Sequence, residues 1–264
     1  MGQAGGMTTA DRWTGQGGRR AAPSNRAAVG DGRAIRNQVG LGRLLPLGGA
    51  RDGAWISEGA AEAVLRRAAG GMRGVRLDAL RIALTDPEDA HEAAVPPPPS
   101  ALPPGPLRVS ADFAATAAEP LPTTADRLRA LLTTAATERL GLTVTEVDLR
   151  VTALLDEDAE PDSVRPPEPA RAAEPAHADE ERVAAAALAV PGVERLTAAL
   201  GGLGQAVHIE KRQGTAALPH RHVRVEIAVR ADHRALDVAR EVRKRVRAAM
   251  PDHPTVAVLV TAVG

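Results

Sequence analysis

Basic side chains recur at helical spacing near the end of the chain, at positions i, i+3, i+4 and i+7 of one predicted helix. These residues are Arg240, Arg243, Lys244 and Arg247. A helix face of this kind could bind the phosphates of a nucleic acid or the headgroups of anionic lipids. It could also be an ordinary solvated face, balanced in part by Asp237 and Glu241, whose arginine stems cover apolar surface. No aromatic residue lies nearby to stack on bases, which argues against binding of single strands.

Histidines form the second candidate group. His220 and His222 alternate onto one strand face, and His208 could lie beside them across a hairpin. Three imidazoles held together could bind zinc and leave one coordination position open. Nothing in the sequence fixes their separation, and no carboxylates are placed to orient them. We therefore interpret this segment as an exposed loop and predict no metal site.

The residues that could act as nucleophiles have simpler explanations. Each serine fits a helix cap, a loop or a strand face, and none lies in a nucleophile-elbow motif; the four considered are Ser57, Ser100, Ser110 and Ser163. The glycine runs at 40–42 and 201–204 lack the Lys-Ser/Thr of a phosphate loop. Paired carboxylates occur only in a flexible linker. The sequence therefore predicts no catalytic residue and no cofactor, and we expect a protein that is not an enzyme.

Composition narrows the possible architectures. The 264 residues include three aromatic residues, Trp13, Trp55 and Phe113, so the core must consist of Ala, Val and Leu. The absence of cysteine excludes disulfides and thiolate chemistry. No segment approaches the roughly 18 to 20 apolar residues that span a bilayer. Net charge is zero, but residues 1–50 carry seven Arg against two Asp, and residues 156–182 carry ten acids against three Arg.

The predicted elements occur twice in the same order. Residues 55–155 and 179–264 each predict a helix, a Gly-Val turn, two strands, a helix and a final strand. The turns are Arg73-Gly74-Val75 and Pro191-Gly192-Val193. The last helix should bury a stripe of apolar residues, namely Leu236, Ala239, Val242, Val246 and Met250. The final strand of the first copy should alternate in the same way, with Val147, Leu149, Val151 and Ala153 facing the core.

Helix starts and connecting segments complete the prediction. Ser57 should cap the first helix, Thr123 and Asp126 should form a capping box, and Asp179 and Asp232 should cap the helices of the second copy. Residues 54–56 predict a short strand or an extended segment that leads into the first helix. The proline-rich residues 86–106 predict an extended loop. Within it, the run at 96–99 could dock into an aromatic groove, although a spacer explains it more simply.

These patterns predict an α+β fold with two related two-layer units, each a small mixed or antiparallel sheet with two helices on one face. We expect residues 1–50 to be a disordered basic tail and a loosely docked entry loop. The first unit should span residues 51–155 and the second, more divergent unit residues 179–264. An acidic, proline-rich linker should join them at 156–178.

The first copy resembles the alkaline-shock (general stress) family of bacterial envelope stress-response proteins. The resemblance rests on Trp55-Ile56-Ser57-Glu58 opening a small-residue helix that ends at Gly74-Val75, on the strand at 109–115, and on the helix at 126–141 followed by LTVTEVDLRV. It covers residues 55–155 best and the second copy more loosely. The family unit is usually single, whereas this chain holds two, and the second copy lacks the Ile-Ser opening.

The resemblance implies a cytoplasmic scaffold or binding protein at or near the inner face of the membrane. Such a protein would act in envelope stress through self-association or through a small membrane-anchored partner. The alternative, drawn from the residues themselves, is a protein that binds an anionic surface or a nucleic acid through Arg240, Arg243, Lys244 and Arg247. Of these two ligands, nucleic acid is the less expected.

Overall fold

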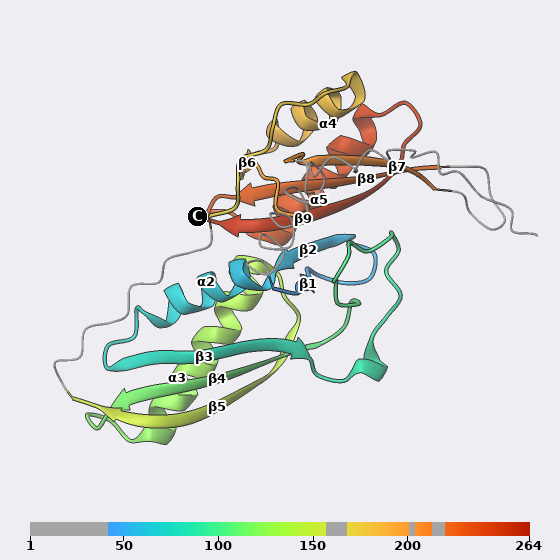
Figure 1. Ribbon diagram of the computed structural model, residues 1–264. Helices are drawn as coiled ribbons and strands as arrows, with labels where there is room; N and C mark the ends of the chain where they lie inside the picture. Colours follow the sequence, from blue (N-terminus) through green and yellow to red (C-terminus); the bar gives the residue numbers. More distant parts are fainter. Residues whose placement is uncertain (1–41, 157–167, 201–203, 213–219) are drawn as a thin grey trace, which may run out of the picture.

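The computed structural model describes residues 42–156, 168–200, 204–212 and 220–264. Within them, nine β-strands form a six-stranded and a three-stranded sheet, and four α-helices pack on these sheets (Figure 1). The fold is α+β, as predicted. The basic tail and Trp13 lie outside the described residues, as does the middle of the acidic linker.

The first unit contains the three-stranded sheet, in the order β3-β4-β5. β3 runs antiparallel to β4, and β4 runs parallel to β5. Helices α2 and α3 pack on this sheet, and α3 continues into a π-helical turn, η2, that ends at Gly141 with φ 88°. The elements in chain order are α2 (Glu58–Ala69), β3 (Val75–Leu84), β4 (Leu107–Thr116), α3 (Leu121–Thr134), η2 (Ala135–Leu140) and β5 (Val144–Leu155).

The second unit repeats this topology. Its central strand β8 pairs in parallel with β9 on one side and antiparallel with β6 and β7 on the other. β6 and β7 together take the place that β3 holds in the first unit, because they pair with successive stretches of β8. The elements are α4 (Ala178–Leu188), β6 (Val193–Leu196), β7 (Val207–Arg212), β8 (His220–Val229), α5 (Ala235–Ala249) and β9 (Thr255–Val263).

The leading strands of the first half belong to the sheet of the second half. β2 (Ala54–Ser57) pairs in parallel with β9, and β1 (Leu44–Pro46) pairs antiparallel with β2. Leu44 and Leu45 are fully buried, so the predicted tail boundary at residue 50 and the loosely docked entry loop are both wrong. Such short apolar runs show that a segment is buried but do not identify the strand with which it pairs.

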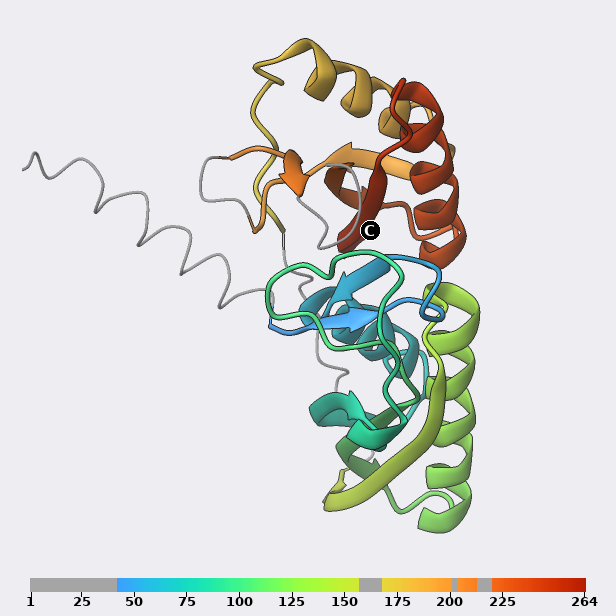
Figure 2. The same ribbon diagram turned by 90° about the vertical axis from the view of Figure 1, so that its right-hand side faces the viewer.

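Helix α2 lies between the two sheets (Figure 1, Figure 2). It contacts β3 in one sheet and β9 in the other, so it is buried on two sides. Its composition suits this position, because small side chains let both sheets approach the helix closely. The buried residues are Ala60, Ala61, Ala63, Val64, Leu65 and Ala69. The apolar faces of both sheets therefore join in one continuous core.

The proline-rich segment covers a sheet face. Helices α4 and α5 pack on one face of the six-stranded sheet. On the opposite face, Val95 packs with Leu44, Trp55 and Leu259 in a second apolar cluster. The indole Nε1 of Trp55 donates to the carbonyl oxygen of Leu102 at 3.2 Å. β2 and β9 are apolar on both faces, and the residues that flank the run at 96–99 pack on the second face, so the run is not a free spacer.

Two of the four predicted helix caps lie in the first unit. The Ser57 hydroxyl accepts a hydrogen bond from the Ala60 amide at 3.3 Å, which confirms this cap. The predicted capping box of Thr123 and Asp126 is wrong, because α3 already begins at Leu121, directly after Pro120. Pro122 suits the first turn of α3, since its fixed φ agrees with a helix start and its missing N–H would have no partner there.

Both caps predicted for the second unit are wrong. Helix α4 begins at Ala178, so Asp179 lies in its first turn and accepts hydrogen bonds from Arg182 and Arg221 at 2.7 and 2.5 Å. Helix α5 begins at Ala235, and Asp232 instead contacts the imidazole of His233 at 2.7 Å. In each case a neighbouring cationic or imidazole side chain, rather than the helix N-terminus, binds the carboxylate.

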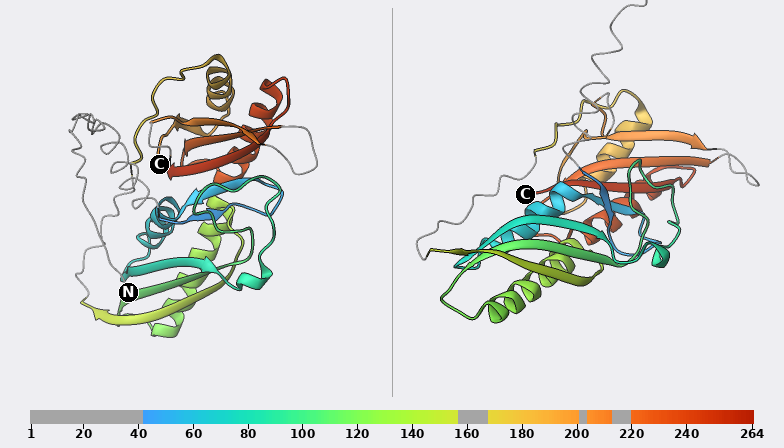
Figure 3. Two further views of the ribbon diagram at one scale, coloured as in Figure 1. Left: turned by 45° about the vertical axis from the view of Figure 1, so that its right-hand side comes forward. Right: turned by 60° about the horizontal axis from the view of Figure 1, so that its bottom comes forward.

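Strand β5 departs from strict alternation. Val151 stands opposite Phe113, but Ala153 stands opposite Ala114, because a bulge shifts the register between them. Ala153 therefore leaves the core face, and Val151 is 39% exposed, so the predicted burial of both residues is wrong. β5 lies at the outer edge of its sheet, as the two views of Figure 3 show.

Candidate anion-binding site

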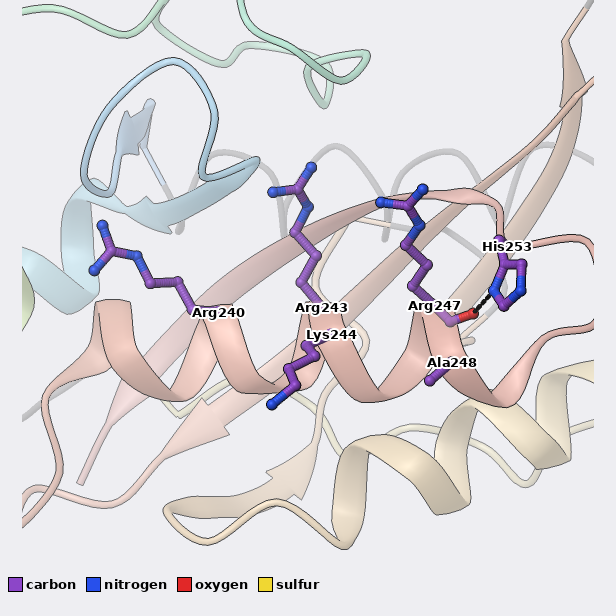
Figure 4. Close-up of a pocket in the computed structure, with 6 residues that line it drawn as sticks. All are labelled: Arg240, Arg243, Lys244, Arg247, Ala248 and His253. Atoms are coloured by element: carbon purple, nitrogen blue, oxygen red, sulfur yellow. Dashed lines mark hydrogen bonds between the residues drawn. The ribbon is translucent and has the colours of Figure 1, made fainter.

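The predicted cationic residues line one surface pocket of about 590 Å³ on helix α5. The four basic side chains are joined there by two further residues (Figure 4); the lining is Arg240, Arg243, Lys244, Arg247, Ala248 and His253. α5 presents this face because its opposite side is apolar and packs on β9. The predicted buried stripe of the helix is confirmed in full, from Leu236 to Met250.

The pocket lies where α5 meets the turn between β1 and β2. Arg240 makes two hydrogen bonds with the Asp52 carboxylate, at 2.8 and 3.0 Å. Arg243 donates from Nη1 to the carbonyl oxygen of Arg51 at 2.5 Å. Gly53 has a φ of +56°, and a Cβ there would lie 3.3 Å from Nε of Arg243. The first half of the chain therefore orients two of the cations that the second half supplies.

Charges around the pocket separate its arginines into two kinds. Burial raises the pKa of Asp52, but hydrogen bonds from Arg240 and Gly49 outweigh this effect and lower the pKa below its usual range. The pKa of Arg240 is raised by the same hydrogen bond. Partial burial lowers the pKa of Arg243, and although Asp52 opposes the shift, Arg247 adds to it. Arg240 is thus engaged by a carboxylate, whereas Arg243 faces another cation.

Arg243 and Arg247 form the open part of the site. Among the described residues, neither guanidinium has a carboxylate within ion-pair distance, whereas Lys244 pairs with Glu241 at 3.7 Å. Figure 4 shows Arg243 and Arg247 pointing to the same side of α5 and Lys244 pointing away from them. The sequence prediction of one face with four cations is therefore accurate for the arginines and less so for Lys244.

His253 closes the end of the pocket beyond α5. Its backbone adopts a left-handed conformation, with φ 46°, which is uncommon for a residue other than glycine. Its Nδ1 lies 3.2 Å from the carbonyl oxygen of Arg247. The sequence analysis missed His253, Asp52 and Gly53 as parts of the site. Asp52 and Gly53 precede the helix by almost two hundred residues, so no local spacing relates them to it.

The other predicted candidate groups do not assemble into a site. Within the described part of the chain, no group of three or more His, Cys, Asp or Glu is placed to hold a metal. His208 stands opposite Arg224 rather than beside His222. His222 is buried, with Nδ1 2.9 Å from the Thr255 hydroxyl, so the exposed-loop interpretation is wrong for this residue. His220, at the start of β8, is exposed.

Of the serines, Ser57 caps α2, and Ser110 lies in β4 on the polar face of its sheet. Ser100 occupies a loop at φ 63°. Gly204 lies in a turn at φ +75°. Ser163 lies outside the described residues, as do the glycine run at 40–41 and most of the run at 201–204.

Glu226 on β8 is a buried carboxyl that the sequence analysis did not single out. The side chain is 0% exposed, because residues 197–200 cover the face of β8 that carries it. One oxygen accepts hydrogen bonds from the amides of Ala199 and Leu200 at 2.6 and 3.1 Å. The other, Oε1, has no hydrogen-bond partner among the described residues and lies 3.8 Å from Nε2 of His208. Burial raises the pKa of Glu226 to about 7, although the two amides oppose the shift.

Comparison of the chain with protein-family models, with curated proteins and with solved structures finds no match. Among the described residues, no helix is long and apolar enough to cross a membrane. The interpretation of the pocket therefore depends on its own geometry.

Proposed function

We propose that this protein is a non-catalytic binding protein whose pocket on α5 takes up a phosphate-bearing ligand. The observation that carries the proposal is the pair of guanidinium groups, Arg243 and Arg247, that share one open pocket without a carboxylate partner among the described residues. Two like charges held side by side repel each other, and a bound anion relieves that repulsion.

Guanidinium groups suit phosphate better than other cations do. Their planar donors match two phosphate oxygens at once, and charge-assisted bonds of this kind are among the stronger hydrogen bonds in proteins. Stacking of unpaired bases would require exposed aromatic residues. Within the described residues, Trp55 and Phe113 are both fully buried, which favours recognition of phosphate groups alone.

The direct test is calorimetric titration with inorganic pyrophosphate, at low and at moderate salt. Arg243→Gln and Arg247→Gln each remove one charge and leave the Arg240 pair with Asp52 in place. We expect each to weaken binding about 10- to 100-fold, since a hydrogen bond to a charged group contributes about 1.5–3 kcal/mol. Raising the salt concentration should weaken binding by the wild-type protein.

The matched control is Arg245→Gln. Arg245 lies on the same helix but outside the pocket lining, and pairs with Glu241 at 2.9 Å. The control variant should bind pyrophosphate within about twofold of wild type, because Arg245 acts on the pocket only through a long-range electrostatic interaction that salt screens. Equal affinity in wild type and in both pocket variants would contradict the proposal.

A second candidate function is a cytoplasmic scaffold in envelope stress that acts through self-association or a small membrane-anchored partner. The resemblance of residues 55–155 supports it, as does an exposed strand edge in the same unit. A tagged protein that spreads evenly through the cytoplasm and co-purifies with no membrane protein would contradict the membrane-partner form.

A further inference from the structure

Strand β5 has an open edge that carries apolar side chains. It is twelve residues long and pairs only with β4, so the amide and carbonyl groups on its outer side have no strand partner among the described residues. A side-chain contact is present at Val147, whose carbonyl oxygen accepts a hydrogen bond from Nε of Arg129 at 3.2 Å. Val151 is 39% and Leu154 65% exposed. Long edge strands with apolar side chains pair readily with another strand, and proteins usually protect them.

The second unit shows how the equivalent edge is protected. β9 occupies the position of β5 in the repeated topology, and its outer edge pairs in parallel with β2. Val258, Leu259 and Val260 stand beside Ala54, Trp55 and Ile56 of β2, and their edge is covered by that strand. No strand from the described part of the chain plays this role for β5. As far as the structure describes the chain, the first unit thus lacks the partner strand that the second unit has.

The residues of β5 are complementary to themselves when the strand is reversed. In an antiparallel pair centred on Leu149, Val147 stands opposite Val151 of a second copy, and Asp148 stands opposite Arg150. These positions lie between the two register shifts of β5, so the backbone there is regular. We propose that two copies of this chain associate through antiparallel pairing of their β5 edges about Leu149.

Electrostatics select this register. Asp148 and Arg150 are 65% and 76% exposed at their side chains, so both can contact a partner copy. On their own sheet they are oriented by ion pairs, Asp148 with Arg108 at 3.5 Å and Arg150 with Asp112 at 2.7 Å. Centring the pair on residue 148 or 150 would place Asp148 or Arg150 opposite its own copy. Like charges directly opposite each other destabilise a strand pair.

Charge reversal tests the register. Sedimentation velocity on the full chain over a concentration series should show wild type in a monomer–dimer equilibrium. Asp148→Arg and Arg150→Asp each convert both symmetry-related charge pairs of the dimer from attraction to repulsion. We expect each variant to raise the dimer dissociation constant about 10- to 100-fold. An equimolar mixture of the two variants should dimerise again, because each then faces opposite charges.

Arg81→Asp is the matched control. Arg81 lies on β3, the other edge of the sheet, opposite Ser110, which is also the β4 partner of Asp148. Arg81→Asp makes the same charge change as Arg150→Asp, on the sheet face that also carries Asp148. It should dimerise like wild type, because it lies away from the β5 edge. Circular dichroism and thermal unfolding verify that each variant folds. If a single reversal does not fold, Val151→Lys provides an independent disruption of the same edge, and it should also shift the equilibrium towards monomer.

Three results would overturn the proposal. The first is a wild-type protein that stays monomeric up to several hundred micromolar, in which case the β5 edge does not pair with a second copy. The second is a dimer that none of the reversals weakens. The third is a mixture of the two reversal variants that fails to associate. The pyrophosphate titration is independent of all three, because the pocket on α5 lies in the other unit.

Discussion

Replacement of Glu226 by glutamine probes the buried carboxyl beneath residues 197–200. The side chain is 0% exposed. One of its oxygens accepts hydrogen bonds from two backbone amides, and the other has no hydrogen-bond partner in the described part of the chain. Glutamine has nearly the same shape, can accept the same two hydrogen bonds through its carbonyl oxygen, and remains neutral at every pH. The variant therefore imitates the protonated form of Glu226.

The expected effect follows from the pKa of Glu226, which burial raises from 4.5 to about 7. The folded protein then binds this proton more tightly than the unfolded chain does. The contribution of protonated Glu226 to the free energy of unfolding is complete below pH 4.5 and is lost as the pH rises through about 7. At about 1.4 kcal/mol per pKa unit, the total is about 3 kcal/mol, of which about 2 kcal/mol falls between pH 5 and pH 8.

Urea unfolding at pH 5, 6, 7 and 8, followed by circular dichroism, measures this effect. The free energy of unfolding of Glu226→Gln minus that of wild type should rise by about 2 kcal/mol between pH 5 and pH 8. Burial, together with Arg224, lowers the pKa of the adjacent His208, which gives wild type a pH dependence of opposite sign near pH 6.5. The comparison is therefore repeated in a His208→Gln background. Parallel stability curves in both backgrounds, within about 0.5 kcal/mol, would refute the reasoning.

Three further substitutions test the packing between the two halves by urea unfolding. Gly141→Ala should destabilise the protein by about 2–4 kcal/mol, because a methyl group at φ 88° is strained and would overlap Leu236; wild-type stability would contradict this. Arg240→Gln should lower stability by about 1 kcal/mol or less, since Arg240 is half exposed beside Asp52, and 0.5 M salt should reduce the difference. Trp55→Ala should lower stability by about 3–5 kcal/mol and speed proteolysis of residues 86–106, and unchanged cleavage would argue against their packing on Trp55.

The repeated order of helices and strands could be predicted because each element has its own period. The alternation of Val223, Val225, Ile227 and Val229 and the spacing from Leu236 to Met250 both correspond to buried faces. The same spacing identified the cations of the pocket, because residues on one helix face are fixed by the helix itself. Local patterns were thus sufficient wherever a single element determines the geometry.

Long-range pairing could not be predicted in this way. Residues 54–57 look the same to a local pattern whether they pair with β3 or, as here, with β9. Asp52 contacts Arg240 of the pocket only because that pairing brings the turn before β2 to α5. The misplaced helix caps have a related cause. Asp179 and Asp232 are good capping residues in isolation, but Arg221 and His233 reach them from elsewhere in the fold or from a neighbouring position.

Because β1 and β2 of the first half pair within the sheet of the second half, the two halves depend on each other. A polypeptide that ends before residue 157 would carry a hairpin without its neighbour β9, and one that begins after residue 167 would leave β9 bare on one side. Two such fragments, made separately and mixed, should therefore complement each other. Deletion of either half alone should therefore destabilise the half that remains.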